Sequence, residues 1–312
     1  MGVFIIMLSK PKSKTLWASI VKNRIFYLML LPVIVYYLIF CYGPMIGIVV
    51  AFQDYKPRLG IFGSEWVGFK YFKALFSTAD FYMVFRNTLI ISALKIGLGF
   101  PAPIILALLI NEVDNQRFKK ITQTISYMPH FLSWVIVVHL FNSMLSLEGP
   151  VNWLTGLFGA APVQFMIQKN MARGILVIVN IWKSVGWGTL IYLAAIAGID
   201  QSQYESAILD GATRFKQILY ITLPSLLPTI VVMFVLRMGS VMNAGMEDVL
   251  LISNSMTYDV LDTIDTYVYK TGITGANYSF ATAVGLFKSV ISLVMVLLTN
   301  KIADKLTGSS LL

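Results

Sequence analysis

Charged residues are scarce in this 312-residue chain, where Asp, Glu, Lys and Arg together make up 12% of the residues. Soluble proteins carry about 25% charged and about 45–50% apolar residues, whereas 57% of this chain is apolar. So little charge cannot cover the surface of a soluble fold of this length. This excludes the two soluble domains that length alone would suggest, and the composition indicates an integral membrane protein.

Cysteine and catalytic motifs are scarce as well. Cys41 is the only cysteine, which excludes an internal disulfide and a cysteine-rich metal site. The sequence has no GxxxxGKS or GxxxxGKT phosphate-binding loop, no HExxH and no GxSxG, so we expect neither an enzyme nor a cofactor in this chain. His130 and His139 are nine residues apart, about half a turn off one helix face, and we interpret them as isolated polar groups.

Six stretches are long and apolar enough to cross a bilayer, which takes about 20 mostly apolar residues. They lie at about 25–50, 87–110, 121–146, 171–198, 223–243 and 280–300. Four of them carry one basic residue each, namely Lys95, Lys183, Arg237 and Lys288. Such interruptions favour helices that face protein or an aqueous interior. We predict an all-α integral membrane fold with six transmembrane helices.

The loops predict the orientation, because Lys and Arg collect on the cytoplasmic side of a membrane. With a cytoplasmic N-terminus, the cytoplasmic pieces hold 12 basic against six acidic residues, and the outer pieces hold eight against nine. We therefore expect both termini in the cytoplasm, a basic arm over 1–24 that includes Lys10, Lys12 and Lys14, and one transmembrane domain over 25–312. The net charge of +9 then reflects topology and contact with membrane lipid rather than nucleic acid binding.

The polar stretch 200–224 predicts a short helix, a break and a second helix at the cytoplasmic end of the bundle. Ser202 and Glu205 have the spacing of a capping box. Gly211 supplies a left-handed or close-approach position that ends the first helix. Pro224 opens the next span, where its missing N–H costs little.

This stretch resembles the EAA loop of binding-protein-dependent ABC importers, which reads Glu-Ala-Ala, three residues, Gly and, about ten residues later, Leu-Pro. The matching positions are Glu205, Ser206, Ala207, Asp210, Gly211, Ala212, Phe215, Ile221, Leu223 and Pro224. Ser206 departs from the pattern, as one small residue in place of another. Three further segments, LMLLPVIVYYLIFCYGPMIGIVVAFQDYKP, SEWVGFKYF and RNTLIIS, look like the maltose-type sugar permeases, in particular the branch that takes up polysaccharide fragments in Gram-positive bacteria.

The resemblance implies a type I ABC importer permease in the bacterial cell membrane. It implies one half of a heterodimer with a second homologous permease, two ATPase subunits that hold ATP and magnesium, and an extracellular solute-binding protein that delivers an oligosaccharide. The EAA helix of this family docks on the ATPase, so Glu205 would contact the ATPase and Gly211 would allow the turn. A purely capping role for Glu205 is the alternative.

Polar and aromatic residues of the fourth and fifth spans are the candidates for a sugar pathway, because sugars bind to aromatic faces, hydrogen-bonding groups and a few placed charges. The candidates are Asn180, Trp182, Lys183, Trp187, Tyr192, Arg237, Ser240 and Asn243. Several of them share one helix face in each span, and the resemblance places both spans around the sugar cavity. An interfacial belt or helix packing is the alternative for the two tryptophans, and an internal partner or snorkelling for the two basic residues.

Lys183 and Arg237 find no carboxylate within the predicted spans. A partner chain or the substrate would then supply one, since ammonium and guanidinium groups bind carboxylates. If the substrate supplies it, the cargo is a uronate-containing oligosaccharide, which we state as a hypothesis.

The predicted outer segment 246–279 is acidic. It holds Glu247, Asp248, Asp259, Asp262 and Asp265 against Lys270. Such a surface suits a solute-binding protein, and a solvated helix is the alternative. Three of the aspartates recur every third residue from Asp259, which predicts a solvated helix face, with calcium or a partner contact as the alternative.

Two other classes of protein are alternatives to the importer subunit. A self-sufficient secondary transporter or channel for a polar solute usually shows internal repeats and a coupling carboxylate near the membrane midplane. A membrane enzyme needs a catalytic constellation. The sequence shows none of these features clearly.

Overall fold

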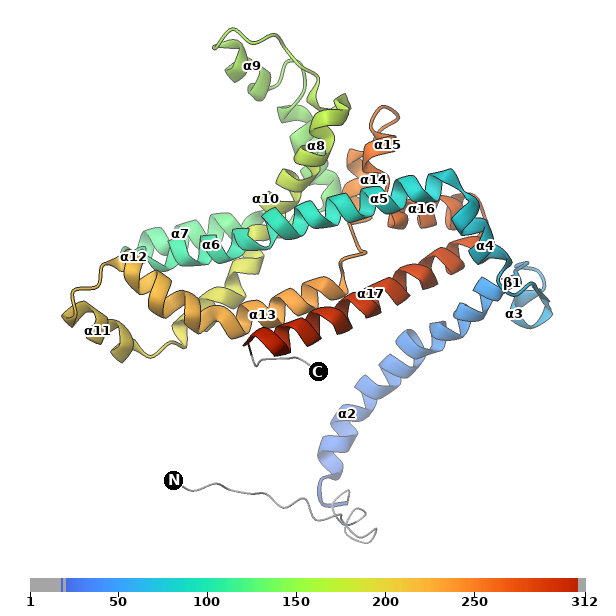
Figure 1. Ribbon diagram of the computed structural model, residues 1–312, viewed down its shortest axis with the longest axis horizontal. Helices are drawn as coiled ribbons and strands as arrows, with labels where there is room; N and C mark the ends of the chain where they lie inside the picture. Colours follow the sequence, from blue (N-terminus) through green and yellow to red (C-terminus); the bar gives the residue numbers. More distant parts are fainter. Residues whose placement is uncertain (1–17, 19–20, 308–312) are drawn as a thin grey trace.

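The computed structural model describes residue 18 and residues 21–307 (Figure 1), so Lys10, Lys12 and Lys14 of the predicted basic arm lie outside the described residues. Within the described part, five helical segments are long and apolar enough to cross a membrane, and a bent pair of helices gives a sixth if it is counted as one span. The five are Arg24–Phe52, Ala79–Asn111, Lys169–Ala197, Arg214–Gly239 and Tyr278–Lys305. The predicted all-α membrane fold is confirmed.

The prediction of one continuous helix over 121–146 is wrong. Three elements replace it: α7 (Gln116–Tyr127), the 3-10 turn η4 (Met128–Phe131) and α8 (Trp134–Met144). The two halves of this span meet at an angle of 106°. Pro129 in the turn cannot donate a helical hydrogen bond, and the Ser133 hydroxyl accepts the Ile136 N–H at 3.3 Å, which starts α8. The two halves taken together are apolar enough for one span although α7 itself is amphipathic, and this hides the break.

Three spans are interrupted by π turns. Their pieces are α2 (Arg24–Tyr37), η1 (Leu38–Tyr42) and η2 (Gly43–Phe52); α5 (Ala79–Leu94), η3 (Lys95–Gly99) and α6 (Pro101–Asn111); and α12 (Arg214–Gln217), η6 (Ile218–Thr222) and α13 (Leu223–Gly239). Each π turn ends two residues before a proline: Pro44, Pro101 or Pro224. Proline has no N–H to donate, and the wider turn lets the helix continue past it. Helices α10 (Lys169–Ala197) and α17 (Tyr278–Thr307) are continuous.

Short elements connect the spans (Figure 1). At one end of the bundle, α11 (Gln201–Leu209) lies between α10 and α12. Away from that end lie β1 (Gln53–Asp54), α3 (Gly60–Gly63), β2 (Glu65–Trp66), α4 (Lys70–Ser77), α14 (Glu247–Ile252), α15 (Tyr258–Leu261), α16 (Ile264–Tyr269) and η7 (Lys270–Thr274). The two strands pair antiparallel, with Gln53 opposite Trp66. After α8, the chain forms α9 (Pro150–Gly156) and η5 (Phe165–Ile167) before it enters α10.

Three apolar clusters hold the bundle together. One joins α5, α8, α10, α14 and α15, the second joins α4, α5, α16 and α17, and the third joins α6, α10 and α13. Helices α5 and α10 each take part in two of them. By contrast, α2 buries no residue and stands away from the bundle, while the following η2 packs against α17.

Candidate functional site

A cavity of about 690 Å³ opens between α6, α10, α13 and the segment that follows α13. Six of the eight predicted pathway residues line it: Asn180, Trp187, Tyr192, Arg237, Ser240 and Asn243. Helix α10 supplies the first three, and α13 with the residues after it supplies the others. The structure therefore brings most of the predicted set to one place.

Arg237 is the unpaired cation of this cavity. Among the described residues, nothing forms a hydrogen bond or an ion pair with its guanidinium group, although the carboxylate of Asp248 also lines the cavity. Asp248 is occupied by two other groups: Lys95 Nζ lies 2.5 Å from its Oδ2, and Asn180 Nδ2 donates to the same oxygen at 3.2 Å. The buried Lys95–Asp248 pair is neutral overall, and the exposed carboxylate of Glu247 lines the cavity as well. The lining therefore balances two positive against two negative charges, and Arg237 is its cation without a hydrogen-bonding partner among the described residues.

Lys183 and Trp182 do not line the cavity. The Lys183 ammonium is buried and donates to three backbone carbonyl oxygens of the bent span, those of Pro129 at 3.3 Å, His130 at 2.8 Å and Leu132 at 2.5 Å. Trp182 packs edge-on against Phe141 of α8, with 5.4 Å between the ring centroids. The alternatives of an internal partner for Lys183 and helix packing for Trp182 match these positions.

An aromatic wall closes one side of the cavity. The imidazole of His130 stacks on the indole of Trp187, with 4.6 Å between the ring centroids and 3° between the planes. His130, predicted to be an isolated polar group, instead faces α10 because the third span breaks at η4. His139, the other histidine, is exposed on α8.

At the other end of the molecule, α11 carries the predicted coupling residues, and its N-terminus differs from the prediction. Asp200 is the N-cap, accepting the Ser202 N–H at 3.0 Å, so the predicted capping box of Ser202 and Glu205 is wrong. Hydrogen bonds from Ser202 lower the pKa of the Asp200 carboxyl. The Glu205 side chain is exposed and makes no hydrogen bond to the described residues, which leaves it free for a partner.

Gly211 ends α11 in a left-handed conformation, with φ of +75°. Its N–H donates to the Ile208 carbonyl at 3.0 Å, and the Ala212 N–H donates to the Ala207 carbonyl at 2.8 Å. These two bonds form a Schellman motif, which favours glycine at this position. A Cβ at Gly211 would meet no atom within 4 Å, so its backbone angle and not close packing requires glycine.

The surface around α11 is partly apolar. Leu209 and Phe215 are 88% and 73% exposed. Ser206, Asp210 and Gly211 are exposed too, whereas Ala207 and Ala212 are half-buried. The Tyr204 hydroxyl lies 2.9 Å from the hydroxyl of the buried Thr222, which ties α11 to the start of α13.

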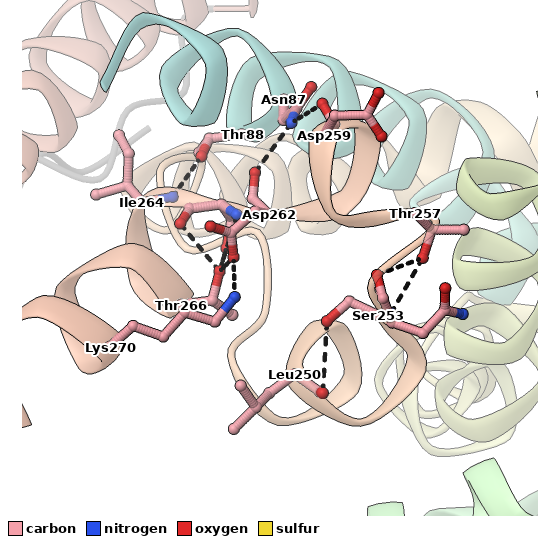
Figure 2. A network of polar contacts seen from close by, with 12 residues as sticks. Asn87, Thr88, Leu250, Ser253, Thr257, Asp259, Asp262, Ile264, Thr266 and Lys270 are labelled. Carbon is pink, nitrogen blue, oxygen red and sulfur yellow. Dashed lines mark hydrogen bonds and ion pairs between the residues drawn. The ribbon is translucent and has the colours of Figure 1, made fainter. Parts of the chain in front are cut away.

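The acidic segment 246–279, predicted to lie on the outer side, is a network of internal contacts (Figure 2). Lys270 pairs with the fully buried Asp262 at 2.9 Å (Figure 2). Lys169 pairs with Asp259 at 2.7 Å, and Lys288 pairs with Asp265. The prediction of a solvated helix face is therefore wrong. Among the described residues, no group of three or more His, Cys, Asp or Glu side chains is placed to hold a metal ion, so the calcium alternative gains no support.

Backbone contacts extend this network. Asn87 Nδ2 donates to the carbonyl oxygens of Asp259 at 2.9 Å and Asp262 at 3.1 Å, and Thr88 Oγ1 accepts the Ile264 N–H at 2.9 Å (Figure 2). Burial and the Asp262 carboxylate raise the pKa of Tyr258 to about 12. The segment is thus anchored to the start of the second span.

An apolar helical bundle with a polar cavity, and with an exposed glycine-ended helix at one end, is the architecture expected of a membrane permease subunit. The chain belongs to the family described as binding-protein-dependent transport system inner membrane component, which matches residues 99–308. It is a multi-pass protein of the bacterial plasma membrane. This membership decides against a self-sufficient secondary transporter or channel.

Two proteins of Bacillus subtilis (strain 168) are similar to nearly the whole chain. The polygalacturonan/rhamnogalacturonan transport system permease protein YteP is 44% identical over 301 residues, which cover 96% of this chain and 94% of YteP. Protein LplB is 45% identical over 300 residues, with coverage of 96% and 94%.

Two crystal structures share the fold. One is a bacterial ABC transporter involved in the import of the acidic polysaccharide alginate, with a TM-score of 0.86 and 43% identity over 94% of this chain and 99% of that chain. The other is a bacterial alginate ABC transporter in complex with an alginate pentasaccharide-bound periplasmic protein, with a TM-score of 0.87, 42% identity and coverage of 95% and 99%. The predicted ABC importer permease fold is confirmed.

Proposed function

We propose that this chain forms one half of the translocation pathway of an ATP-driven importer for uronate-containing oligosaccharides. The observation that carries the proposal is the unpaired Arg237 guanidinium in a cavity walled by the His130–Trp187 stack. Alginate and polygalacturonan, named for similar proteins, are acidic polysaccharides, which supports an acidic cargo.

The chemistry of the cavity suits such a cargo. A guanidinium group binds a carboxylate through two parallel charge-assisted hydrogen bonds. Asp248 and Glu247 are the carboxylates of the cavity that would compete for Arg237. Lys95 and Asn180 hold Oδ2 of Asp248, and Glu247 forms no ion pair or hydrogen bond with Arg237 in the described part of the chain. The indole of Trp187 offers an apolar face to a sugar ring. Lys183, which the sequence also suggested as a carboxylate ligand, is left out of this proposal because carbonyl oxygens surround its ammonium group.

The partners of the proposed importer follow from the family. A second homologous permease completes the pathway, an extracellular solute-binding protein delivers the oligosaccharide, and two ATPase subunits bind ATP and magnesium. In this proposal the ATPase docks on α11, where Glu205 has no partner in the described chain and Leu209 and Phe215 expose apolar surface.

The test is uptake of oligogalacturonate by the complete importer in proteoliposomes. Arg237→Gln should lower ATP-driven uptake about tenfold or more, because a hydrogen bond to a charged group contributes about 1.5–3 kcal/mol. Arg237→Lys should keep part of the activity. The matched control is Arg58→Gln, which removes an exposed arginine outside the cavity. Unchanged uptake in an Arg237→Gln complex that assembles normally would contradict the proposal.

A further inference from the structure

Helices α8 and α9 and the chain up to Gln164 form an arm that leaves the bundle sideways (Figure 1). We call residues 134–164 the lateral arm. Its first helix runs level with the middle of α10: the ring of Trp134 lies 5.3 Å from Lys183 Nζ, and Phe141 contacts Trp182. Lys183 is the central residue of the 29-residue helix α10.

This level corresponds to the interior of the membrane. A helix of that length rises about 43 Å at about 1.5 Å per residue, more than the hydrocarbon thickness of about 30 Å, so its central residues lie near the midplane. Trp134 and Phe141 of α8 both lie at this level. Helix α8 therefore runs parallel to the membrane plane, at the depth of the hydrocarbon core, and does not span the membrane.

The tip of the lateral arm is apolar and exposed. Its exposed large side chains are Trp153 at 65%, Leu154 at 51%, Leu157 at 64% and Phe158 at 90%. Glu148 is the only Asp, Glu, Lys or Arg between Trp134 and Gln168. Water is therefore an unfavourable neighbour for this surface.

Lipid is also an unfavourable neighbour for the tip, because of its backbone. Residues 160–164 have no regular secondary structure, and the Ala161 N–H makes no hydrogen bond within the described part of the chain. Irregular backbone exposed to lipid does not occur at membrane depth, because each unpaired polar group costs several kcal/mol there; it is tolerated where protein buries it.

Internal contacts nevertheless hold the lateral arm in a defined conformation. Asn152 is buried, and its side-chain amide donates to the carbonyl oxygens of Ser146 at 2.7 Å and Val163 at 2.8 Å. Its Oδ1 accepts the Val163 N–H at 2.8 Å. A Cβ at Gly149 would lie 2.5 Å from the Met144 carbonyl oxygen, so the corner between α8 and α9 is closed tightly.

We propose that the lateral arm packs on the second permease subunit within the membrane, with Phe158 and Trp153 as its anchors. This proposal rests on the proposed function, which supplies the second permease. An apolar surface at membrane depth fits another membrane-embedded chain. The solute-binding protein is a poorer fit, because it would meet the molecule beyond the outer ends of the spans, on the side where α3 and β1 lie (Figure 1).

A photo-cross-linker tests the contact in the complete, purified importer. p-Benzoylphenylalanine replaces Phe158, and in a matched control it replaces Phe62, which is 100% exposed on α3. We expect an adduct with the second permease from position 158 and none from position 62. Adducts with lipid or with the solute-binding protein alone, or no adduct at all, would overturn the proposal. Absence of a second permease from the purified complex would instead contradict the proposed function.

Charge substitutions provide a second measurement. Phe158→Glu and Trp153→Glu should each lower the amount of second permease that co-purifies by about tenfold, the size of effect that a central aromatic anchor has in an interface. Phe62→Glu should leave it unchanged. Normal co-purification with both arm variants would contradict the anchoring role, while the cross-linking result does not depend on whether these variants fold.

Discussion

Lys183 on α10 donates a hydrogen bond to the carbonyl oxygen of Leu132 at 2.5 Å, at the corner where α7 gives way to α8. Carbonyl oxygens at a helix break have no partner within the helix, and the bilayer interior offers no water to replace it. The Lys183 ammonium fills this role for the carbonyls of His130 and Leu132, and it is a second donor to the Pro129 carbonyl, which also accepts the Leu132 N–H at 3.2 Å. We predict that Lys183→Met lowers the free energy of unfolding by about 2 kcal/mol, since each orphaned carbonyl carries a desolvation penalty of about 1–3 kcal/mol.

The melting temperature of the purified importer measures this effect. Lys169→Met is the matched control, because its ammonium forms an exposed ion pair with Asp259, and such pairs contribute about 0–1 kcal/mol. Equal melting of wild type and Lys183→Met would show that Lys183 does not hold the corner.

The buried pair of Lys95 and Asp248 should respond differently to single and double substitution. Asp248→Asn leaves an ammonium group uncompensated in a site where both side chains are 3–4% exposed, and we predict a loss of about 3–5 kcal/mol. Replacing both residues, as in Lys95→Met with Asp248→Leu, should restore most of the stability, because neither charge then remains buried. A double mutant no more stable than Asp248→Asn would contradict this account of the pair.

Glu205→Lys should separate ATP hydrolysis from uptake. The side chain is exposed and has no partner within the described chain, so the melting temperature should stay close to that of wild type, as for most surface substitutions. Under the proposed docking of the ATPase on α11, the reversed charge should leave ATP hydrolysis largely intact and lower uptake severalfold. Gln203→Lys, which adds a lysine at another exposed position of α11, is the control. Wild-type uptake by Glu205→Lys would refute a coupling role.

Local signals in the sequence predicted some features well. Gly211 was predicted to be a left-handed or a close-approach position, and its φ of +75°, with no atom within 4 Å of a Cβ there, agrees with the first of these. The start of the same helix was assigned to Ser202 although Asp200 is the cap, because both residue types serve as N-caps and they lie two positions apart. The break after Pro129 could also be predicted, from the proline and from Ser133 as a cap. It was missed because the two helices together are apolar enough for one span.

Long-range pairs could not be predicted in this way. Lys95 and Asp248 are 153 residues apart in the chain, and nothing in either local pattern indicates the other. The same limit applies to Lys183, whose partners are backbone carbonyls that become available only because the third span bends. The cavity was located because it depends on helix faces, whereas which cation remains free depends on tertiary contacts.

Two substitutions of Gly211 test the turn after α11: one strains the left-handed conformation, and the other prevents it. Gly211→Ala should lower the free energy of unfolding by about 1–2 kcal/mol, the cost of a left-handed conformation for a residue with a Cβ, and uptake should persist because the site has free space around the glycine. Gly211→Pro should abolish uptake, since proline fixes φ near −65° and removes the N–H that donates to Ile208. Full uptake by Gly211→Pro would show that the turn is not needed for coupling.

We predict that ionisation of Tyr258 destabilises the folded protein at alkaline pH. Burial and the Asp262 carboxylate raise its pKa to about 12, against about 10 in an unfolded chain. The neutral phenol therefore stabilises the folded state fully below pH of about 10, and this contribution is lost as the pH rises from about 10 to about 12. Tyr258→Phe keeps the ring that lies 4.4 Å from Lys270 Nζ but cannot ionise. Its melting temperature should rise relative to wild type across this range, whereas Tyr220→Phe, at a 72% exposed position, should follow wild type. Parallel melting curves for Tyr258→Phe and wild type up to pH of about 12 would contradict the raised pKa.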